Sequence, residues 1–305
     1  MQILRAIMIG DVVGEPGLNV LENRLPHLIK EYSADFVTVN GENAAAGFGL
    51  TAPLLERLFA AGADVVTSGN HIWEQREFWP VLDTEARMLR PMNYPDLGAG
   101  NTGQRTASAT ADRLVGKGWV KLEKPSSQGG QPVSWLVINL QGRELMKALD
   151  CPFKTFDAFE ASLGNPVTQI HPILTPEGKL PENMEEKLII LVDFHAESTS
   201  EKEALAFYLD GRVSVVAGTH THVQTADNRI LPKGTAYITD LGMTGVLDGV
   251  IGMDTKICLD RARNQVLYRM EVAASDTESK TAVQGIIVEI DSETRRAISI
   301  QRLSA

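Results

Sequence analysis

The sequence predicts an α/β protein, and three observations lead to that prediction. Residues 3–68 and 186–218 alternate short apolar, β-rich runs with helical segments, the pattern of strand, helix, strand units around a largely buried sheet. Residues 281–290 and 295–303 are two further β-rich runs that flank the turn residues DSET, and they predict a β-hairpin. Polar residues directly follow the predicted strands, as they do at the ligand crevices of open α/β sheets.

The first third of the chain is predicted to contain three strands and two helices. The strands cover residues 3–9, 35–40 and 64–68, and the helices cover 17–32 and 51–63. Thr51 is a typical N-cap residue, and Pro53 fits the first turn that follows it. Pro26 is expected to kink or divide the first helix, because proline lacks the N–H that an interior helix position donates.

The later half repeats the same order of elements. We expect a strand at 186–195, a helix at 200–212 that opens with a capping box of Ser200 and Glu203, and a strand at 212–218. Between roughly residues 97 and 135 the chain is rich in Gly, Ser, Gln and Asn, which predicts exposed connections around a small β excursion. Without any internal repeat, residues 1–305 are expected to form a single domain that ends in the hairpin of 281–303.

The composition excludes several classes of protein. Of the 305 residues, 43% are hydrophobic and 22% are charged, and no apolar run approaches the roughly 18 residues of a membrane helix. The N-terminal MQILRAIMIGDVVG is typical of a first strand and not of a signal peptide, so we expect a cytoplasmic protein without membrane association. A net charge of -10 argues against binding a long nucleic acid. Cys151 and Cys258 are expected to be buried, reduced thiols.

Residues that could carry chemistry follow five of the predicted strands. The carboxyl ends of strands in an open α/β sheet border one crevice, so residues far apart in the sequence can converge on one site. Four of the six histidines of the chain belong to this set. The set comprises Asp11, Asn40, Glu42, Asn43, Asn70, His71, Asp193, His195, Thr219, His220 and His222.

Taken singly, each residue also has a purely structural explanation. Asp11 fits a turn or a helix cap, Glu42 fits a glycine-flanked loop, and His195 fits a hydrogen-bonded strand end. His220 and His222 are more telling, because a spacing of two puts them on one face of an extended segment, from which two imidazoles can bind adjacent metals. The structural explanations would all have to hold together, so a shared metal site is the better interpretation.

The types of side chain restrict the metal. Imidazole suits zinc, iron, manganese and related ions, carboxylate and amide oxygens suit the harder ions among them, and no thiolate is present to indicate a structural zinc site. A mixed nitrogen and oxygen set fits a catalytic site. A carboxylate that bridges two ions roughly 3.5–4 Å apart would form the two-metal arrangement used for displacement at phosphorus.

Together, the motifs resemble the calcineurin-like metallophosphoesterase superfamily and, more closely, the bacterial YmdB-like phosphodiesterases. The chain follows that family's order of motifs with GDVVG, NGENAAAGFGLT, TSGNHIW, RPMNYP, VDFHAESTSEK, GTHTHVQTAD and YITDLGMTG. The resemblance implies a metallophosphoesterase α/β sandwich, in which two mixed β-sheets are flanked by helices and the metal site lies at the C-terminal ends of strands.

The resemblance also implies a role for each of eight residues. One metal would be held by Asp11, Asn43 and His222, a second by Asn70, His195 and His220, and Glu42 would bridge the two ions. His71 would not bind metal; it would face the substrate, stabilise the phosphorane and protonate the leaving alkoxide. The cofactors would be two divalent metal ions, with iron or manganese expected first and magnesium or zinc compatible.

Some positions depart from the pattern of the wider superfamily. Val13 stands where that pattern has a histidine, and Glu42 replaces the usual bridging aspartate; both changes are shared with the YmdB-like group. Relative to that group, the Gly-rich stretch at 98–104 and the segment 165–182 look unusual, and we expect them to affect access of the substrate and not the metal centre.

Several other residues have two interpretations. Arg90, Asn93 and Tyr94 could contact a phosphate or a base, or could form a Pro-containing turn that packs against the site. Thr219 and Thr221 could bond the substrate or orient the histidines, and Asp193 is expected behind the histidines.

The activity implied by the resemblance is hydrolysis of a small phosphate ester, a 2',3'-cyclic nucleotide or cyclic AMP, by a dimetal phosphodiesterase. The residues alone reach only as far as metal-assisted hydrolysis of a phosphate ester. A regulatory protein that binds a nucleotide or RNA through the same metal site with little turnover is the alternative, and a hydrolase of amides or carboxyl esters is disfavoured. A homo-oligomer is expected, because closed symmetric assemblies are common.

Overall fold

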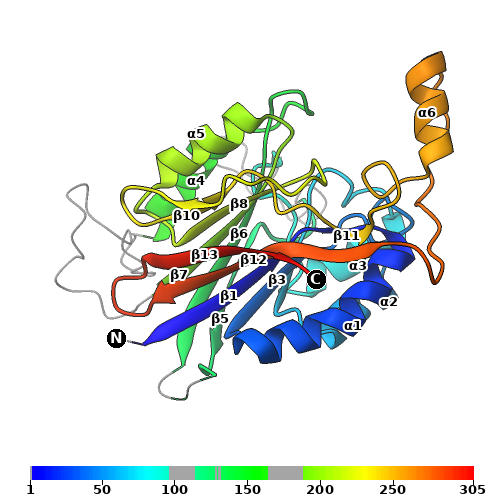
Figure 1. The fold of residues 1–305 in the computed structure, drawn as a ribbon. Helices are drawn as coiled ribbons and strands as arrows, with labels where there is room; N and C mark the ends of the chain where they lie inside the picture. The colour runs from blue at the N-terminus through cyan, green and yellow to red at the C-terminus, as the bar shows by residue number, and fades with distance from the viewer. Residues whose placement is uncertain (1, 96–113, 128, 130–131, 164–187) are drawn as a thin grey trace.

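The computed structural model describes residues 2–95, 114–127, 129, 132–163 and 188–305. Within these ranges, two mixed β-sheets pack against each other and helices cover their outer faces (Figure 1). The predicted α/β sandwich is therefore confirmed. No helix in the described ranges is both long enough and apolar enough to cross a membrane.

The seven-stranded sheet combines strands from the two ends of the chain. Its strands are β1 (Ile3–Ile9), β2 (Asp11–Val12), β3 (Phe36–Asn40), β4 (Val65–Thr67), β11 (Met243–Val246), β12 (Thr281–Asp291) and β13 (Ala297–Ser304). β1 is central and runs parallel to β3 and antiparallel to β12. β4 extends the parallel side, while β11 and β13 both pair with β12.

The six-stranded sheet is built from the middle of the chain. Its strands are β5 (Trp119–Lys124), β6 (Val133–Gln141), β7 (Leu188–His195), β8 (Val215–Thr219), β9 (Arg229–Ile230) and β10 (Ala236–Ile238). β6, β7, β8 and β10 run parallel to one another, and β5 and β9 pair antiparallel at the two edges.

Helices form the outer layers. They are α1 (Gly14–Tyr32), α2 (Ala52–Ala60), the 3-10 turn η1 (Arg76–Phe78), α3 (Trp79–Thr84), α4 (Pro152–Leu163), α5 (Thr199–Leu209) and α6 (Thr255–Asn264). α1 and α2 pack on the seven-stranded sheet, and α4 and α5 pack on the six-stranded sheet (Figure 1). α6 stands away from the body and has no buried residue.

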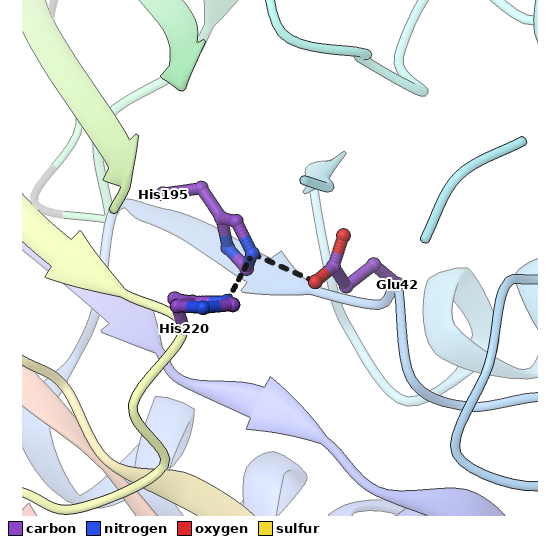
Figure 2. A group of neighbouring side chains, drawn as sticks. All are labelled: Glu42, His195 and His220. Carbon is purple, nitrogen blue, oxygen red and sulfur yellow. Dashed lines mark hydrogen bonds and ion pairs between the residues drawn. The ribbon is translucent and has the colours of Figure 1, made fainter. Parts of the chain in front are cut away.

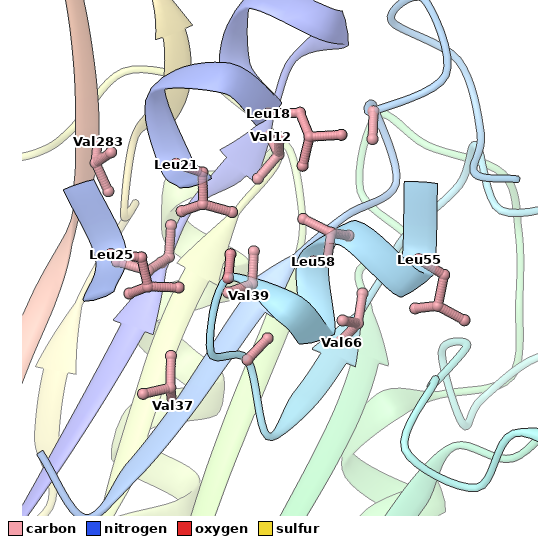
Figure 3. Packing of buried hydrophobic residues seen from close by; sticks show 14 of the residues in the cluster. Val12, Leu18, Leu21, Leu25, Val37, Val39, Leu55, Leu58, Val66 and Val283 are labelled. Atoms are coloured by element: carbon pink, nitrogen blue, oxygen red, sulfur yellow. The ribbon is translucent and has the colours of Figure 1, made fainter. Parts of the chain in front are cut away.

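Side chains of β1 alternate between two hydrophobic layers. Ala6 and Met8 point into the layer between the sheets, whereas Ile7 and Ile9 pack on the side of α1 and α2. This follows from the period of two in a strand, and it explains why a run as apolar as ILRAIMI is buried on both faces. Figure 3 shows the helix side of the sheet, where leucines of α1 and α2 meet valines of the strands. The strands that lead to the site are thus held from both faces.

Helix α1 differs from its prediction. It begins at Gly14 and not at residue 17, and it continues through Pro26 to Tyr32 without interruption. Pro26 is exposed, so the carbonyl that loses its helical partner can face water. The expectation that Pro26 divides the helix is therefore wrong.

The start of α5 was also predicted at the wrong residue. The N-cap is Ser198 and not Ser200, and Oγ of Ser198 accepts a hydrogen bond from the N–H of Glu201 at 3.2 Å. The side chain of Ser198 is fixed further by Oε2 of Glu144 at 2.5 Å. By contrast, Thr51 is the N-cap residue of α2 as predicted, although its side chain makes no capping hydrogen bond.

Two other expectations need correction. The described part of the expected β excursion forms β5 and β6, and β6 is an interior strand of the six-stranded sheet that carries the fully buried Trp135. The Gly-rich stretch at 98–104 and the segment 165–182 lie outside the described residues. Cys151 and Cys258 are free, but both are only partly buried.

Candidate metal centre

All seven predicted metal ligands lie in one network of contacts, where the two sheets meet at the carboxyl ends of their parallel strands. Strand β2 and the loops after β3 and β4 bring residues from the seven-stranded sheet, and β7 and the loop after β8 bring the histidines from the other sheet. We divide the network into two parts. The His195 half consists of Glu42, Asn70, His195 and His220, and the Asp11 half consists of Asp11, Asn43 and His222.

The His195 half converges on Nε2 of His195. Oε1 of Glu42 lies 2.8 Å from this atom, Oδ1 of Asn70 lies 3.0 Å from it, and Nδ1 of His220 also lies 3.0 Å from it. Figure 2 shows Glu42 and His220 approaching His195 from separate segments. Ligand atoms of Glu42, His195 and His220 all lie within 4.8 Å of one another, so one cation can contact all three.

The Asp11 half is joined by Asn43. Nδ2 of Asn43 lies 3.3 Å from Oδ1 of Asp11 and 3.0 Å from Nε2 of His222. The distance between Oδ1 of Asp11 and Nε2 of His222 is 3.7 Å. The backbone N–H of His220 donates to Oδ2 of Asp11 at 3.2 Å, which links the two halves. In this arrangement Asn43 presents its amide nitrogen, and metal binding would need its oxygen in that place.

The three histidines share one arrangement of their ring nitrogens. Nδ1 of His222 faces the carbonyl oxygen of Ile251 at 2.9 Å, and a carbonyl only accepts hydrogen bonds. Nε2 of His220 faces a carboxylate oxygen of Glu197 at 3.1 Å. Each of these outer nitrogens therefore carries the proton, and the inner nitrogen presents a lone pair to the site.

His195 follows the same rule through a hydroxyl. Its Nδ1 lies 3.0 Å from Oγ1 of Thr219, and that hydroxyl donates its own proton to Oδ1 of Asp193 at 2.7 Å. The Thr219 oxygen must then accept from Nδ1, so Nε2 is the nitrogen that would offer a lone pair to a metal. Four atoms that can offer lone pairs to a cation meet in the His195 half, and the buried Oε1 of Glu42 is one of them. This donor set fits a metal cation.

The pKa shifts of His195 and Glu42 show that the buried carboxylates favour positive charge beside them. Burial acts to lower the pKa of His195, but the carboxylates of Glu42, Asp11 and Asp193 outweigh it and raise the pKa to about 9. Burial acts to raise the pKa of Glu42, but His195 and His71 outweigh it and lower the pKa to about 2. The charged form of the His195 ring is therefore favoured near neutral pH when no cation is bound, and the lone pair of Nε2 becomes available when a cation takes the place of that proton.

Two neighbours complete the electrostatics. Burial, with the nearby His195 and Lys202, lowers the pKa of His220 to about 3, so this ring stays neutral and can act as a ligand. Burial raises the pKa of Asp11 above its ordinary value, and the carboxylates of Glu42 and Asp240 act in the same direction. Carboxylates crowded in a buried space in this way are typical of cation sites.

A buried carboxylate supports the His195 half from behind. Oδ2 of Asp193 accepts hydrogen bonds from the hydroxyl of Thr67 and from Nδ2 of Asn40, the latter at 3.1 Å. Oδ1 of Asn40 in turn accepts the N–H of Glu42 at 3.2 Å. Asp193 also accepts a hydrogen bond from the Thr219 hydroxyl. It therefore orients His195 through Thr219 and Glu42 through Asn40. Burial raises the pKa of Asp193 to about 6 against these hydrogen bonds.

His71 occupies a different position from its neighbour Asn70. Its backbone N–H donates to Oε2 of Glu42 at 3.1 Å, and its ring packs edge-on against Phe48 with centroids 5.1 Å apart. Nδ1 lies 3.6 Å from Oε1 of Glu74, and the side chain is 27% exposed. In the described part of the chain, no hydrogen bond joins this ring to a predicted ligand. Asn70 thus contacts His195 while the ring of its neighbour His71 lies against Phe48 and Glu74.

Backbone geometry shapes the two loops that carry most ligands. A Cβ at Gly69 would lie 2.1 Å from Cδ2 of His195, so only glycine lets the SGNH loop approach this ring. The GTHTH segment is a turn and not extended as predicted, because His220 and His222 have φ values of 102° and 63°. The two rings consequently face different halves of the site.

Comparison with known proteins identifies the family. The chain matches the model of the family described as YmdB-like protein over residues 7–303. It is 40% identical over 300 residues to the 2',3'-cyclic-nucleotide 2'-phosphodiesterase of Bacillus subtilis (strain 168), which covers 98% of this chain and 96% of that protein. The chain belongs to the YmdB-like family.

Solved structures agree with this assignment to the YmdB-like family. A crystal structure described as a novel phosphatase from Mycoplasma pneumoniae has a TM-score of 0.79 and 30% identity, and covers 100% of this chain and 94% of its own. A hypothetical protein from Thermus thermophilus has a TM-score of 0.75 and 35% identity, with 99% of each chain covered.

Three contacts of this YmdB-like site were not predicted from the sequence. The hydroxyl of Thr67 donates a hydrogen bond to Asp193. A carboxylate oxygen of Glu197 contacts Nε2 of His220, and the backbone carbonyl of Ile251 accepts a hydrogen bond from Nδ1 of His222. Thr67 could have been found as a strand-end residue. Glu197 is half exposed and follows no pattern, and a backbone carbonyl leaves no side-chain signal in a sequence.

The RPMNYP residues serve packing. Arg90 is buried and donates from Nε and Nη1 to the carbonyls of Val115 and Pro91. Asn93 is buried and its amide bonds the backbone of Gln141 and Asp150. Both side chains are thus used to fix a turn next to β6.

Proposed function

We propose that this protein is a metal-dependent phosphodiesterase that hydrolyses phosphate esters of small nucleotides, namely 2',3'-cyclic nucleotides or cyclic AMP. The observation that carries the proposal is the arrangement of His195 and His220 around the buried carboxylate of Glu42, with His222 beside the buried carboxylate of Asp11. The name of the Bacillus subtilis relative supports the class of substrate.

Two divalent ions are the proposed cofactors. Asp11, Asn43 and His222 would hold one ion, Asn70, His195 and His220 the other, and Glu42 would bridge them. Bound ions would supply Lewis-acid activation of the phosphate ester and of water. The mixed set of imidazole, carboxylate and amide ligands favours iron or manganese, and magnesium or zinc is also compatible with it.

His71 is proposed as the catalytic residue of this chain. Its ring is partly exposed and makes no hydrogen bond to the ligand network in the described residues, its backbone N–H donates to Glu42, and the ring packs edge-on against Phe48. An imidazole placed there can donate a proton to the leaving alkoxide and stabilise negative charge in the transition state. The overall charge of -10 is consistent with a small substrate, because a long polyanion would be repelled away from the metal centre.

The proposal is tested by assaying purified protein with Mn²⁺ against 2',3'-cyclic AMP, 3',5'-cyclic AMP and bis-p-nitrophenyl phosphate. We expect hydrolysis that chelation abolishes and added Mn²⁺ restores. Glu42→Gln should lower kcat/KM by more than about 100-fold, beyond the usual cost of losing an outer-sphere partner.

Glu201→Gln provides the matched control. Glu201 is also a buried glutamate, but its carboxylate bonds the backbone N–H groups of Arg143 and Glu144 away from the metal centre. This variant should keep its kcat/KM for a phosphodiester. Undiminished hydrolysis by Glu42→Gln, or by the chelated wild type, would contradict the proposal.

A further inference from the structure

A buried ion pair lies beneath the GTHTH loop and is not part of the proposed metal centre. Lys202 belongs to the VDFHAESTSEK motif and Asp240 to the YITDLGMTG motif. Nζ of Lys202 lies 2.7 Å from Oδ2 of Asp240, and the two side chains are 1% and 0% exposed. Burying two charges costs solvation free energy that a hydrophobic pair would not lose, so stability alone does not explain this pair.

The carboxylate of Asp240 binds the backbone on two sides. Oδ2 accepts the N–H of Thr221 at 3.1 Å, and Oδ1 accepts the N–H of Gly242 at 2.9 Å. Thr221 is the residue between His220 and His222. The carbonyl of Gly242 accepts the N–H of Asp11 at 3.2 Å. One carboxylate therefore connects to the backbone of ligands in both halves of the site.

The GTHTH loop needs such a connection because its conformation is unfavourable. His220 and His222 both have positive φ values, a region that residues with a Cβ rarely adopt unless the surroundings impose it. The hydrogen bond from Thr221 to Asp240 fixes the peptide between them. Without it, the loop could relax and both rings would leave their present directions.

Lys202 fixes the carboxylate in turn. Lys202 lies in the first turn of α5, and its aliphatic chain packs against Gly218 near the end of β8. If Gly218 carried a Cβ, that atom would lie only 2.9 Å from Cδ of Lys202. Asp240 meets three donors, an ammonium and two backbone N–H groups, and two carboxylate oxygens can accept from all of them. An asparagine would offer one oxygen and would turn an N–H₂ group toward another donor.

We propose that the Lys202–Asp240 pair positions the GTHTH loop for metal binding, so that His220 and His222 each direct a ring nitrogen into its own half of the site. This inference rests on the proposed function, since it assigns a purpose to the pair only if the histidines bind metal. Lys202 and Asp240 are positioning residues and touch neither metal nor substrate.

The test is titration of Mn²⁺ into metal-free, full-length protein by calorimetry, together with the melting temperature of each metal-free variant. Asp240→Asn and Lys202→Met should each weaken Mn²⁺ binding about 10- to 100-fold, the range found for partners that orient metal ligands. The double variant Lys202→Met with Asp240→Asn leaves no unpaired buried charge. Its melting temperature should be higher than that of either single variant, while its Mn²⁺ affinity should stay below that of the wild type.

Asp210→Asn is the matched control for a structural effect. Asp210 is also a buried carboxylate that accepts two backbone N–H groups, those of Lys233 and Thr235. These two residues precede β10, whereas Asp240 follows its end. This variant should lose melting temperature and keep the wild-type affinity for Mn²⁺.

The outcomes separate this inference from the proposed function. The positioning role is overturned if the double variant binds Mn²⁺ within twofold of the wild-type affinity. It is also overturned if Asp210→Asn loses as much Mn²⁺ affinity as the double variant. Either result leaves the proposed function standing. A wild-type protein that binds Mn²⁺ but hydrolyses no phosphodiester overturns the proposed function alone. A wild-type protein that binds no Mn²⁺ overturns both.

Discussion

The two halves of the site differ in what surrounds their ligands. The His195 half has two imidazoles, and its central ring is held through Thr219 by the buried carboxylate of Asp193. The Asp11 half has one imidazole, and that ring is held by a backbone carbonyl, that of Ile251. Val13 stands where the superfamily would supply a second imidazole. The His195 half is therefore richer in nitrogen and more firmly oriented, and the Asp11 half is richer in oxygen.

This difference predicts that the halves select different ions. Imidazole nitrogens favour iron, zinc and manganese, whereas carboxylate and amide oxygens also accept magnesium. We expect the His195 half to retain a transition metal through purification and the Asp11 half to exchange its ion with the buffer.

The largest expected effect comes from removing one imidazole from each half. His195→Ala should lower retention of transition metal by more than about 100-fold and abolish hydrolysis, because it removes the atom on which the other ligands converge. His222→Ala should lose less metal, since Asp11 and Asn43 still offer oxygens. Elemental analysis after dialysis measures both, with the exposed His27→Ala as control. Equal metal loss in the two variants would show that the halves are equivalent.

A second prediction separates catalysis from metal binding. His71→Ala should lower kcat for a phosphodiester by about 10²- to 10⁴-fold, the usual range for a general acid, because its ring is placed to protonate the leaving group. Its metal content should match the wild type, since the ring belongs to neither half. Full activity, or loss of metal from either half, would remove His71 from its proposed role.

Much of this arrangement could be predicted from strand patterns. β1 has the bounds predicted for it, and the rule that polar residues gather at strand ends found all seven residues of the network, because parallel strands end at the same edge. Ligand atoms of Glu42, His195 and His220 lie within 4.8 Å of one another, and the bridging role of Glu42 stays a prediction.

The features that the sequence did not predict depend on contacts between residues far apart in the chain. Ser198 caps α5 although Thr199 and Ser200 follow it, and Glu144, far away in the sequence, also bonds it. β6 was not predicted as a separate strand, because the chain that precedes it is rich in glycine and polar residues. The turn of the GTHTH segment depends on Asp240, which is distant in the sequence, so a local pattern suggested an extended segment.

A smaller effect is expected when only the hydroxyl that orients His195 is removed, because among the described residues the Asp11 half has no such link to Asp193. Thr219→Val keeps the shape of the side chain and removes the hydroxyl between His195 and Asp193. It should weaken the more tightly bound ion about 10- to 100-fold and spare the other. Thr244→Val is the control, because the Thr244 hydroxyl is buried near the Asp11 half and has no hydrogen-bond partner among the residues that the structure describes. If Thr219→Val binds both ions normally, the Asp193 connection does not orient His195.

The smallest expected effect is steric. Gly69→Ala would place a Cβ 2.1 Å from Cδ2 of the His195 ring, so the ring or the SGNH loop must move. Overpacking of this kind costs about 1–3 kcal/mol of unfolding free energy, measurable by urea denaturation. Gly245→Ala is the matched control near the Asp11 half, where a Cβ would meet Cβ of Val13 at an ordinary 3.4 Å. Because displacement of the ring tilts its Nε2 away from Glu42 and Asn70, Gly69→Ala should also lower metal retention in the His195 half, and equal behaviour of the two alanine variants would contradict the tight packing inferred there.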